Sequence, residues 1–153
     1  MPQEDPVDVG ILLNVAFGKF KRDLHRHLAE HGFADLGPSF GYVFRLLARS
    51  PCNLQGVSAT LGITSQGALK IVDDMAEKGY VIRRDDPNDG RVKWLELTAR
   101  ATQAMAQAQR FHRQFERELA ARVGKAPVAA LRLVLEAVYA DANAEGLAEI
   151  RPI

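Results

Sequence analysis

Two short apolar segments joined by a glycine constrain the fold of this chain more than any other feature. The first segment covers about 53–61, the second covers about 64–78, and Gly62 lies between them. Glycine adopts the positive φ of a tight turn without a steric clash at Cβ. The arrangement predicts a helix-turn-helix, with Asn53 as the N-cap of its first helix.

Two strand-like segments follow the second helix. Residues 80–84 include β-branched and aromatic side chains, and residues 91–97 alternate polar and apolar side chains. The residues between them, 85–90, are all of turn-forming types. This pattern predicts a β-hairpin. A helix-turn-helix followed by a hairpin is the layout of a winged helix, in which the hairpin is the wing.

The flanking sequence predicts further helices on both sides of this unit. Their spans, taken from apolar periodicity and capping signals, are about 7–31, 40–48, 98–123 and, beginning at Pro127, 128–142. The last helix is apolar nearly all round, and such a helix must be covered on most sides. We therefore expect a second copy of the chain to cover it, with the first helix taking part.

The predicted fold is mainly α with a small β-hairpin wing: a winged helix-turn-helix domain plus a helical dimerisation region. A length of 153 residues corresponds to about one domain. We assign residues 1–153 to this single domain. Its winged helix-turn-helix covers about 38–97, and its dimerisation helices cover about 7–31 and 98–143.

Charge is sorted along the chain although its sum is close to zero. The net charge is +1, which by itself does not indicate a nucleic-acid partner. Residues 19–49, however, hold six basic and three acidic side chains, and residues 98–132 hold seven basic and two acidic ones. This sorting permits a basic face on a nearly neutral protein.

Several sequence features bear on location. No apolar run approaches the length of about 18 residues that a membrane span needs, and the acidic N-terminus lacks the layout of a secretory signal. The single cysteine, Cys52, cannot form an intramolecular disulfide. A reducing compartment is therefore expected, and we predict a cytoplasmic protein that does not act at a membrane.

The segment 62–98 resembles the MarR family of bacterial transcriptional regulators. It resembles that family's recognition helix, its DPxDxR wing (residues 86–91) and its Leu-Thr start of the next helix at 97–98. The resemblance implies a homodimeric, sequence-specific DNA-binding repressor or activator, released from DNA by a small-molecule effector or an oxidised cysteine. One departure is Gly90, where the family often has a basic residue.

DNA contacts are expected from the outer face of the second helix, which either Thr64 or Ser65 caps. Gln66 can bind adenine, Lys70 can reach guanine or phosphate, and Leu69 can touch a thymine methyl. The backbone amides at the helix start can bind phosphate. The full set of predicted DNA-binding residues is Thr64, Ser65, Gln66, Gly67, Leu69 and Lys70 on the helix, Asn88, Gly90, Arg91 and Lys93 on the wing, and Arg45 and Arg49 on the preceding helix.

Some of these assignments have structural alternatives. Arg91 can enter the minor groove or form a wing salt bridge with Asp89, and Arg45 and Arg49 can simply face solvent. Arg83 and Arg84 are expected to contact phosphate or to pair with the neighbouring acids at 85 and 86. Gly67 is expected to allow a close backbone approach. The acids of the later turns, at 73, 74 and 77, are expected to point away from the groove.

Other chemistry is less well supported. Cys52 is a candidate redox site, but a small buried hydrophobic residue is the preferred interpretation. His27 and His31 share a helix face without further ligands, so neither a metal nor another cofactor is expected. Catalytic and nucleotide-binding motifs are missing, so an enzyme is not expected. Aromatic residues that can line an effector pocket are Phe17, Phe20, Phe40, Tyr42, Phe44, Phe111 and Phe115.

Two alternatives to a DNA-binding regulator stay open at this point. One is a winged-helix module that binds proteins and has lost DNA binding, which the near-neutral charge and Gly90 favour slightly. The other is a redox or metal sensor of the same fold.

Overall fold

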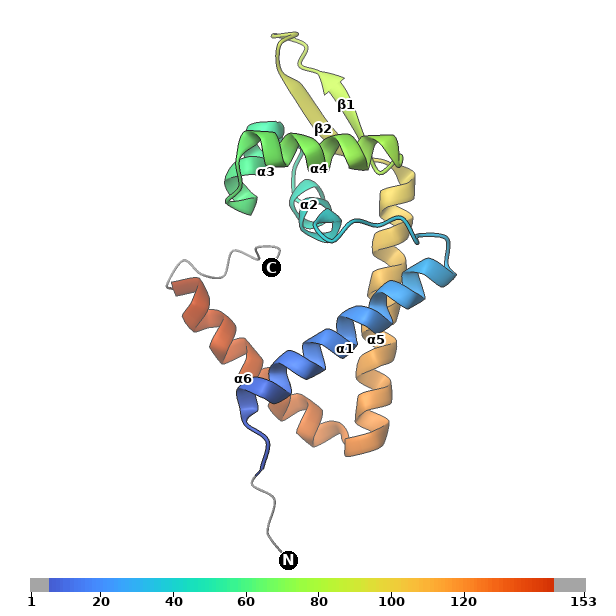
Figure 1. Ribbon diagram of the computed structural model, residues 1–153, viewed down its shortest axis with the longest axis vertical. Helices are drawn as coiled ribbons and strands as arrows, with labels where there is room; N and C mark the ends of the chain where they lie inside the picture. The colour runs from blue at the N-terminus through green and yellow to red at the C-terminus, as the bar shows by residue number, and fades with distance from the viewer. Residues whose placement is uncertain (1–5, 145–153) are drawn as a thin grey trace, which may run out of the picture.

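The computed structural model describes residues 6–144, which form six helices and one two-stranded sheet. In chain order the elements are α1 (Val9–Glu30), α2 (Phe40–Leu47), α3 (Leu54–Leu61), α4 (Ser65–Glu77), β1 (Val81–Asp85), β2 (Lys93–Leu97), α5 (Ala99–Val123) and α6 (Lys125–Ala144). Figure 1 shows α2, α3, α4 and the hairpin grouped at one end of the molecule. The long helices α1, α5 and α6 extend from that end and form the rest. The predicted fold class is confirmed.

The helix-turn-helix forms through the predicted local signals. The Asn53 side chain accepts a hydrogen bond of 3.0 Å from the backbone N–H of Gly56 and caps α3. Gly62 ends α3 in the left-handed region, with φ of 61°. Thr64, rather than Ser65, caps α4, because its Oγ1 accepts a hydrogen bond of 3.1 Å from the backbone N–H of Gly67.

The hairpin is antiparallel, and its register pairs Val81 with Leu97 and Asp85 with Lys93. The second strand begins two residues later than predicted. Arg91 and Val92 lie in the turn, where the backbone N–H of Val92 donates to the Asp89 carbonyl at 2.9 Å. The N–H groups of Arg91 and Val92 therefore bond within the turn, to Asp89, while the Val92 carbonyl accepts from the Asp86 N–H across the hairpin at 3.0 Å.

The buried core lies almost entirely in the winged domain. Apolar faces of α2, α3 and α4 and the inner side of the hairpin meet there, and Tyr80 is the largest side chain with no exposed surface. The buried residues from these parts include Val43, Phe44, Val57, Leu61, Ala68, Val72, Met75, Tyr80, Val81 and Leu95. This core presents α4 and the wing on a rigid support.

The helices outside the winged domain pack through an aromatic cluster. The Phe20 ring of α1 lies 5.4 Å from the Phe111 ring and 5.0 Å from the Phe115 ring, both on α5, measured between ring centroids. Helix α6 begins at Lys125, earlier than predicted, and Pro127 is its third residue. Proline is tolerated there because the first-turn N–H groups have no partner inside the helix.

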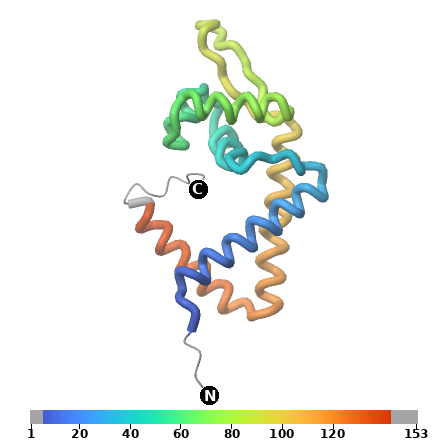
Figure 2. The backbone as a smooth tube through the Cα atoms, viewed as in Figure 1, coloured from blue at the N-terminus to red at the C-terminus, as the bar shows by residue number. Residues whose placement is uncertain are grey.

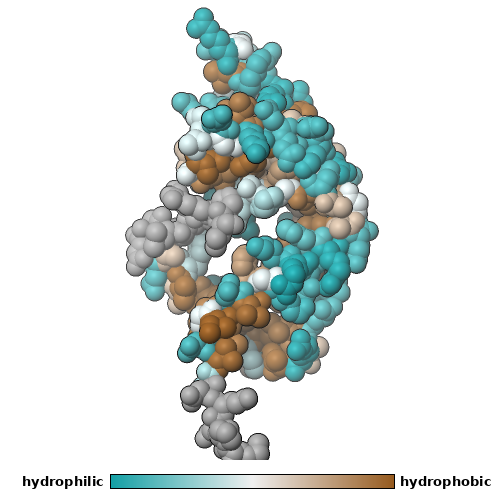
Figure 3. All heavy atoms as spheres, viewed as in Figure 1, coloured by the Kyte–Doolittle hydropathy of each residue, from teal (hydrophilic) through white to brown (hydrophobic). Residues whose placement is uncertain are grey.

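Large apolar side chains remain exposed on α1 and α6. Figure 3 shows apolar residues gathered where these two helices lie. We call this set the α1–α6 apolar surface: Val9, Ile11, Leu12, Leu13, Val15 and Phe17 of α1, and Leu131, Leu133, Val134, Leu135, Val138 and Tyr139 of α6. Within the part of the chain that the structure describes, none of the helices has the length and hydropathy of a membrane span.

Candidate nucleic-acid interface

The outer face of α4 is exposed and polar at its N-terminal end. Figure 1 shows α4 running across the winged domain beneath the projecting hairpin. Ser65, Gln66 and Lys70 are exposed, and Leu69 keeps 43% of its surface accessible. Gln66, Leu69 and Lys70 line a groove of 660 Å³ between α4 and the start of α2. Ala68, Val72 and Met75, on the opposite face, are fully buried. The helix therefore presents the expected side chains away from the core.

Gly67 is half-buried rather than open to a ligand. A Cβ atom at this position would lie 3.3 Å from Thr64 Oγ1 and 3.8 Å from Ile63 Cδ1. The missing side chain therefore makes room for the Thr64 cap. The expected close approach of the Gly67 backbone to DNA stays a prediction.

Asp73, Asp74 and Glu77, the acids in the later turns of α4, line the groove of the protein between α4 and the start of α2. Their expected direction, away from the major groove of DNA, stays a prediction. Asp73 is paired with Arg83 of β1, and Asp74 is paired with Lys78 at 2.9 Å. These three carboxylates make the later turns of α4 acidic, whereas its first two turns carry Lys70 and no acid.

Asp86 organises the tip of the wing. One carboxylate oxygen accepts hydrogen bonds from the backbone N–H groups of Asn88 (2.7 Å) and Asp89 (3.2 Å). The other accepts a hydrogen bond of 2.7 Å from Nε1 of Trp94 on β2. The Trp94 hydrogen bond, followed by that of the Asn88 amide, lowers the pKa of Asp86. Residue types alone assign Asp86 a place in the wing motif but not these hydrogen bonds.

Three cations of the hairpin are paired with carboxylates. Arg83 pairs with Asp73, Arg84 pairs with Glu96 at 2.6 Å, and Lys93 pairs with Asp85 across the strands. The predicted partners of the two arginines were the neighbours Asp85 and Asp86. Neither pairing forms among residues 6–144, because Asp85 is paired with Lys93 and Asp86 accepts hydrogen bonds from Trp94 and two backbone amides. The other predicted role of the two arginines, contact with phosphate, stays a prediction.

Arg91 of the wing and Lys70 of α4 are exposed cations without an ion-pair partner among residues 6–144. The predicted wing salt bridge between Asp89 and Arg91 is replaced by a backbone contact, in which the Arg91 N–H donates to Asp89 Oδ1 at 3.0 Å. The Arg91 guanidinium is therefore available to a ligand. Asn88 and Gly90 are exposed beside it.

Arg45 and Arg49 are exposed at the end of α2. The pKa of His112 on α5 is lowered, first by burial and then by the positive charge of Arg45. Arg45 is therefore near enough to α5 for its charge to act on His112.

The side chains considered as redox or metal sites, Cys52, His27 and His31, make contacts within the fold. Cys52 is half-buried, its carbonyl accepts the Leu95 N–H at 2.8 Å, and burial raises the pKa of its thiol. A protonated thiol is a weak nucleophile. His31 Nδ1 lies 2.7 Å from the His27 carbonyl oxygen. Among the residues that the structure describes, three or more metal-ligating side chains do not come together.

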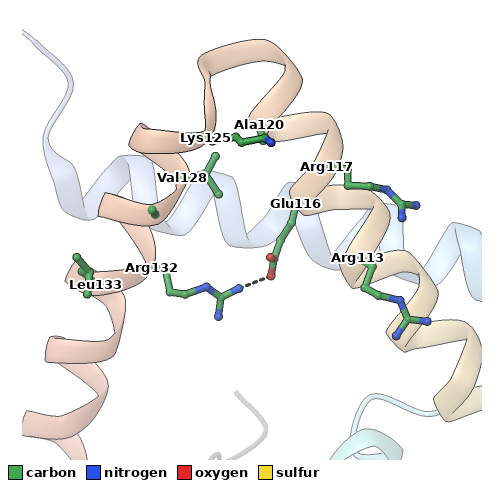
Figure 4. A pocket seen from close by; sticks show the side chains of 9 residues that line it. Arg113, Glu116, Arg117, Ala120, Lys125, Val128, Arg132 and Leu133 are labelled. Atoms are coloured by element: carbon green, nitrogen blue, oxygen red, sulfur yellow. Dashed lines mark hydrogen bonds and ion pairs between the residues drawn. The ribbon is translucent and has the colours of Figure 1, made fainter.

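The predicted aromatic pocket is not formed as such. Phe40 and Phe44 belong to the core, and Phe20, Phe111 and Phe115 fill the space between α1 and α5. A cleft of 690 Å³ lies instead between α5 and α6 (Figure 4). Its lining residues are Arg113, Glu116, Arg117, Ala120, Lys125, Val128, Ala129, Arg132 and Leu133. Arg132 and Glu116 form an ion pair of 2.6 Å across it.

The helix-turn-helix, its exposed second helix and the adjoining hairpin define a winged helix-turn-helix protein. Residues 34–92 match the MarR family. This match covers most of the winged helix-turn-helix, and it agrees with the resemblance that the sequence motifs indicate.

Individual relatives agree with this assignment. The chain is 29% identical over 83 residues to an uncharacterised HTH-type transcriptional regulator, YkoM, of Bacillus subtilis strain 168. The match covers 54% of this chain and 53% of YkoM, so the chain spans about half the length of that relative.

Solved structures share the fold over most of the chain. The reduced form of MarR from E. coli superposes with a TM-score of 0.69 at 21% identity, covering 88% of this chain and 98% of MarR. The transcriptional repressor CouR, solved bound to a 23-mer DNA duplex, superposes with a TM-score of 0.64 at 25% identity. That match covers 86% of this chain and 92% of CouR.

Proposed function

We propose that this chain is a sequence-specific DNA-binding transcriptional regulator that acts as a homodimer on a pseudo-palindromic operator. The observation that carries the proposal is the exposed face of α4, on which Gln66 and Lys70 stand beside a wing with a free Arg91. A helix of this kind fits the major groove, where base pairs differ in their donors and acceptors. The family match and the DNA complex of CouR support the same function.

Each predicted contact has a distinct chemical task in this proposal. Gln66 reads a base, Lys70 binds guanine or a phosphate, and Leu69 contacts a thymine methyl. The Thr64 cap leaves other amides of the first turn of α4 able to bind phosphate, together with Ser65. Arg91 enters the minor groove, flanked by Asn88 and Gly90. Lys93 must exchange Asp85 for phosphate, which is feasible because an exposed ion pair is weak.

The dimer is proposed from the α1–α6 apolar surface. Soluble monomers rarely expose a contiguous apolar surface of this kind without a partner. A two-fold axis through α1, α5 and α6 would place one α4 in each of two successive major grooves, about 34–36 Å apart. The helices of about 7–31 and 98–143 are thereby the dimerisation region, and 38–97 the DNA-binding part.

We further propose how the protein is regulated and where it acts. A small-molecule effector is proposed to release the DNA, and the cleft between α5 and α6 is a place for it at the dimer helices. The protein acts by binding rather than by catalysis, and it works in the cytoplasm, where its DNA is. We propose repression as the mode of regulation, because CouR, whose fold is similar, is a transcriptional repressor.

The test is binding to an operator duplex recovered by selection from a random pool. Lys70→Ala and Gln66→Ala are each expected to weaken binding by about 1–3 kcal/mol, roughly 5- to 150-fold, because a bidentate base contact contributes that much. Lys21→Ala, an exposed lysine of α1, is the control and is expected to leave affinity unchanged. Unchanged affinity for both α4 variants would remove these residues from the interface.

Salt dependence distinguishes the protein-binding alternative. If the chain binds DNA, retention on a random duplex falls steeply as salt rises, because bound phosphates release counterions. A chain that ignores duplexes at low salt would favour a winged-helix module that binds proteins.

A further inference from the structure

A polar cluster joins three segments at the junction between the winged domain and the long helices. We call it the junction cluster: Asp35, Tyr80 and Arg100. Tyr80 Oη donates to Asp35 Oδ1 at 2.5 Å, and Arg100 Nη2 donates to the two oxygens of Asp35 at 3.0 and 3.2 Å. Arg100 Nη2 also lies 3.4 Å from the Gly32 carbonyl oxygen. Asp35 lies between α1 and α2, Tyr80 precedes β1, and Arg100 is in the first turn of α5.

The cluster is anchored in the core on one side. The Tyr80 side chain is fully buried, and its ring centroid lies 5.6 Å from those of Phe40 and Phe44. The Arg100 guanidinium lies 4.8 Å from the Tyr80 ring centroid and 5.4 Å from that of Phe33. The Asp35 and Arg100 side chains keep 37% and 39% of their surface exposed, so the buried Tyr80 is the member that fixes the cluster to the core. Hydrogen bonds to an ionised carboxylate are stronger than those between neutral groups.

The cluster links the two chain connections between the winged domain and the long helices, which are the one from α1 to α2 and the one from β2 to α5. The backbone of the α5 start is held separately, since Thr98 N–H donates to the Tyr80 carbonyl at 3.1 Å. The connection from α1 to α2 passes beside the start of α5 (Figure 2). Asp35 supplies the side-chain bonds that tie this connection to both Tyr80 and Arg100. Losing them would free one of the two connections between the winged domain and the long helices.

We propose that the junction cluster is a positioning device that sets the half-site spacing of the operator. The inference rests on the proposed function. In a homodimer, the angle between each winged domain and the long helices fixes the distance and rotation between the two copies of α4. Asp35, Tyr80 and Arg100 are positioning residues, because they act through α4 and touch no DNA themselves.

The physical consequence is selectivity for spacing rather than for sequence. Each base pair inserted between half-sites moves one half-site by about 3.4 Å and rotates it by roughly 35°, since a turn contains 10–10.5 base pairs. A rigid junction cannot follow this change. A junction without the cluster can reorient each winged domain and lose less affinity.

The experiment compares three duplexes: the symmetric motif recovered by selection, and the same motif with one or two base pairs added between its halves. The wild-type protein is expected to lose at least about tenfold in affinity on insertion, a loss comparable to that of a mismatched base pair. Tyr80→Phe and Asp35→Asn, which keep side-chain shape, are expected to narrow that loss to about threefold or less. Affinity for an isolated half-site stays as in the wild type.

Tyr42→Phe is the matched control, because the Tyr42 hydroxyl has no side-chain hydrogen bond within residues 6–144. It is expected to keep the wild-type spacing selectivity. Variants that discriminate spacing as sharply as the wild type would overturn the inference while the proposed function stands. A wild-type protein that binds no duplex would overturn the proposed function, and this inference with it.

Discussion

At the scale of single residues, Tyr80 connects the core to the polar surface of the junction. Its buried ring belongs to the hydrophobic core, while its hydroxyl donates to Asp35. Burial, and then the hydrogen bond to the Asp35 carboxylate, raise the pKa of Tyr80 to about 12. Burial alone would raise the pKa of Asp35, but the Tyr80 hydrogen bond and the Arg100 charge outweigh it and lower that pKa overall. Near neutral pH, Tyr80 is therefore protonated and Asp35 is ionised, which is the state in which the hydroxyl donates to the carboxylate.

These shifts predict a loss of stability in alkali. The unfolded Tyr80 loses its proton near its ordinary pKa of 10.0, whereas the folded one does so at about 12. The stabilising contribution is therefore complete below pH 10 and is lost as the pH rises to about 12, with a slope of up to about 1.4 kcal/mol per pH unit. Denaturant unfolding across this range should show the slope in the wild type. Tyr80→Phe should lack this part of it, and an identical slope in that variant would contradict the assignment.

At the scale of elements, α4 depends on the residues that start and stop it. The Thr64 side chain satisfies one of the free N–H groups of the first turn, and Gly79 ends the helix region with φ of 77°. The first turn is also where Ser65 and Gln66 face outward. Fraying at this end would disorder those side chains as well as reduce stability.

Thr64→Ala is therefore expected to lower the free energy of unfolding by about 1 kcal/mol, because an N-cap is lost. Operator affinity should fall as well, since the first turn of α4 contributes contacts. Thermal and denaturant unfolding measure the first effect and gel-shift titration measures the second. Thr60→Ala, an exposed position within α3, is the matched control. A variant at Thr64 as stable as that control would show that the cap contributes nothing.

Sequence alone predicted the parts of the fold that local signals control. The Asn53 cap, the turn at Gly62 and the hairpin follow from residue types at short spacing, and the structure confirms them. The ion pair of Arg83 could not be predicted, because it depends on how α4 meets the hairpin, and that of Arg84 with Glu96 depends on the register of the two strands. The contact between Asp35 and Tyr80 spans 45 positions and has no local signature.

The candidate DNA-binding site likewise has features that the sequence predicts and features that it does not. The outward direction of Gln66 and Lys70 follows from helical periodicity, because the buried positions fix the face of α4. The role of Gly67 beneath the Thr64 cap and the backbone contact between Asp89 and Arg91 depend on local geometry that residue types do not specify.

At the scale of the whole molecule, the core and the exposed apolar residues are unevenly distributed. The winged domain buries its apolar side chains, whereas Leu13 of α1 is 48% exposed and Val134 of α6 is 61% exposed. Burying apolar surface yields about 25 cal/mol per Å². Two copies that cover each other's α1–α6 apolar surface would therefore gain much of the stability that a single copy lacks.

Leu13→Glu and Val134→Glu are predicted to weaken the dimer, because each would bury a charge without a partner. Sedimentation equilibrium should show a dimer for the wild type and a shift to monomer for the variants. Ile82→Glu on β1, which is 39% exposed and lies outside this surface, is the control and should remain dimeric. A wild-type protein that is monomeric at all concentrations would argue against a two-fold arrangement of α4.

The central claim is that two copies of α4 read DNA together, and selection of bound duplexes from a random pool tests it most directly. The wild-type protein should enrich a two-fold symmetric motif whose half-sites lie about 10–10.5 base pairs apart, centre to centre. The Lys70→Ala variant should enrich it less. A pool that shows no enriched motif after repeated rounds, or one enriched equally by a variant lacking both Gln66 and Lys70 side chains, would contradict the account.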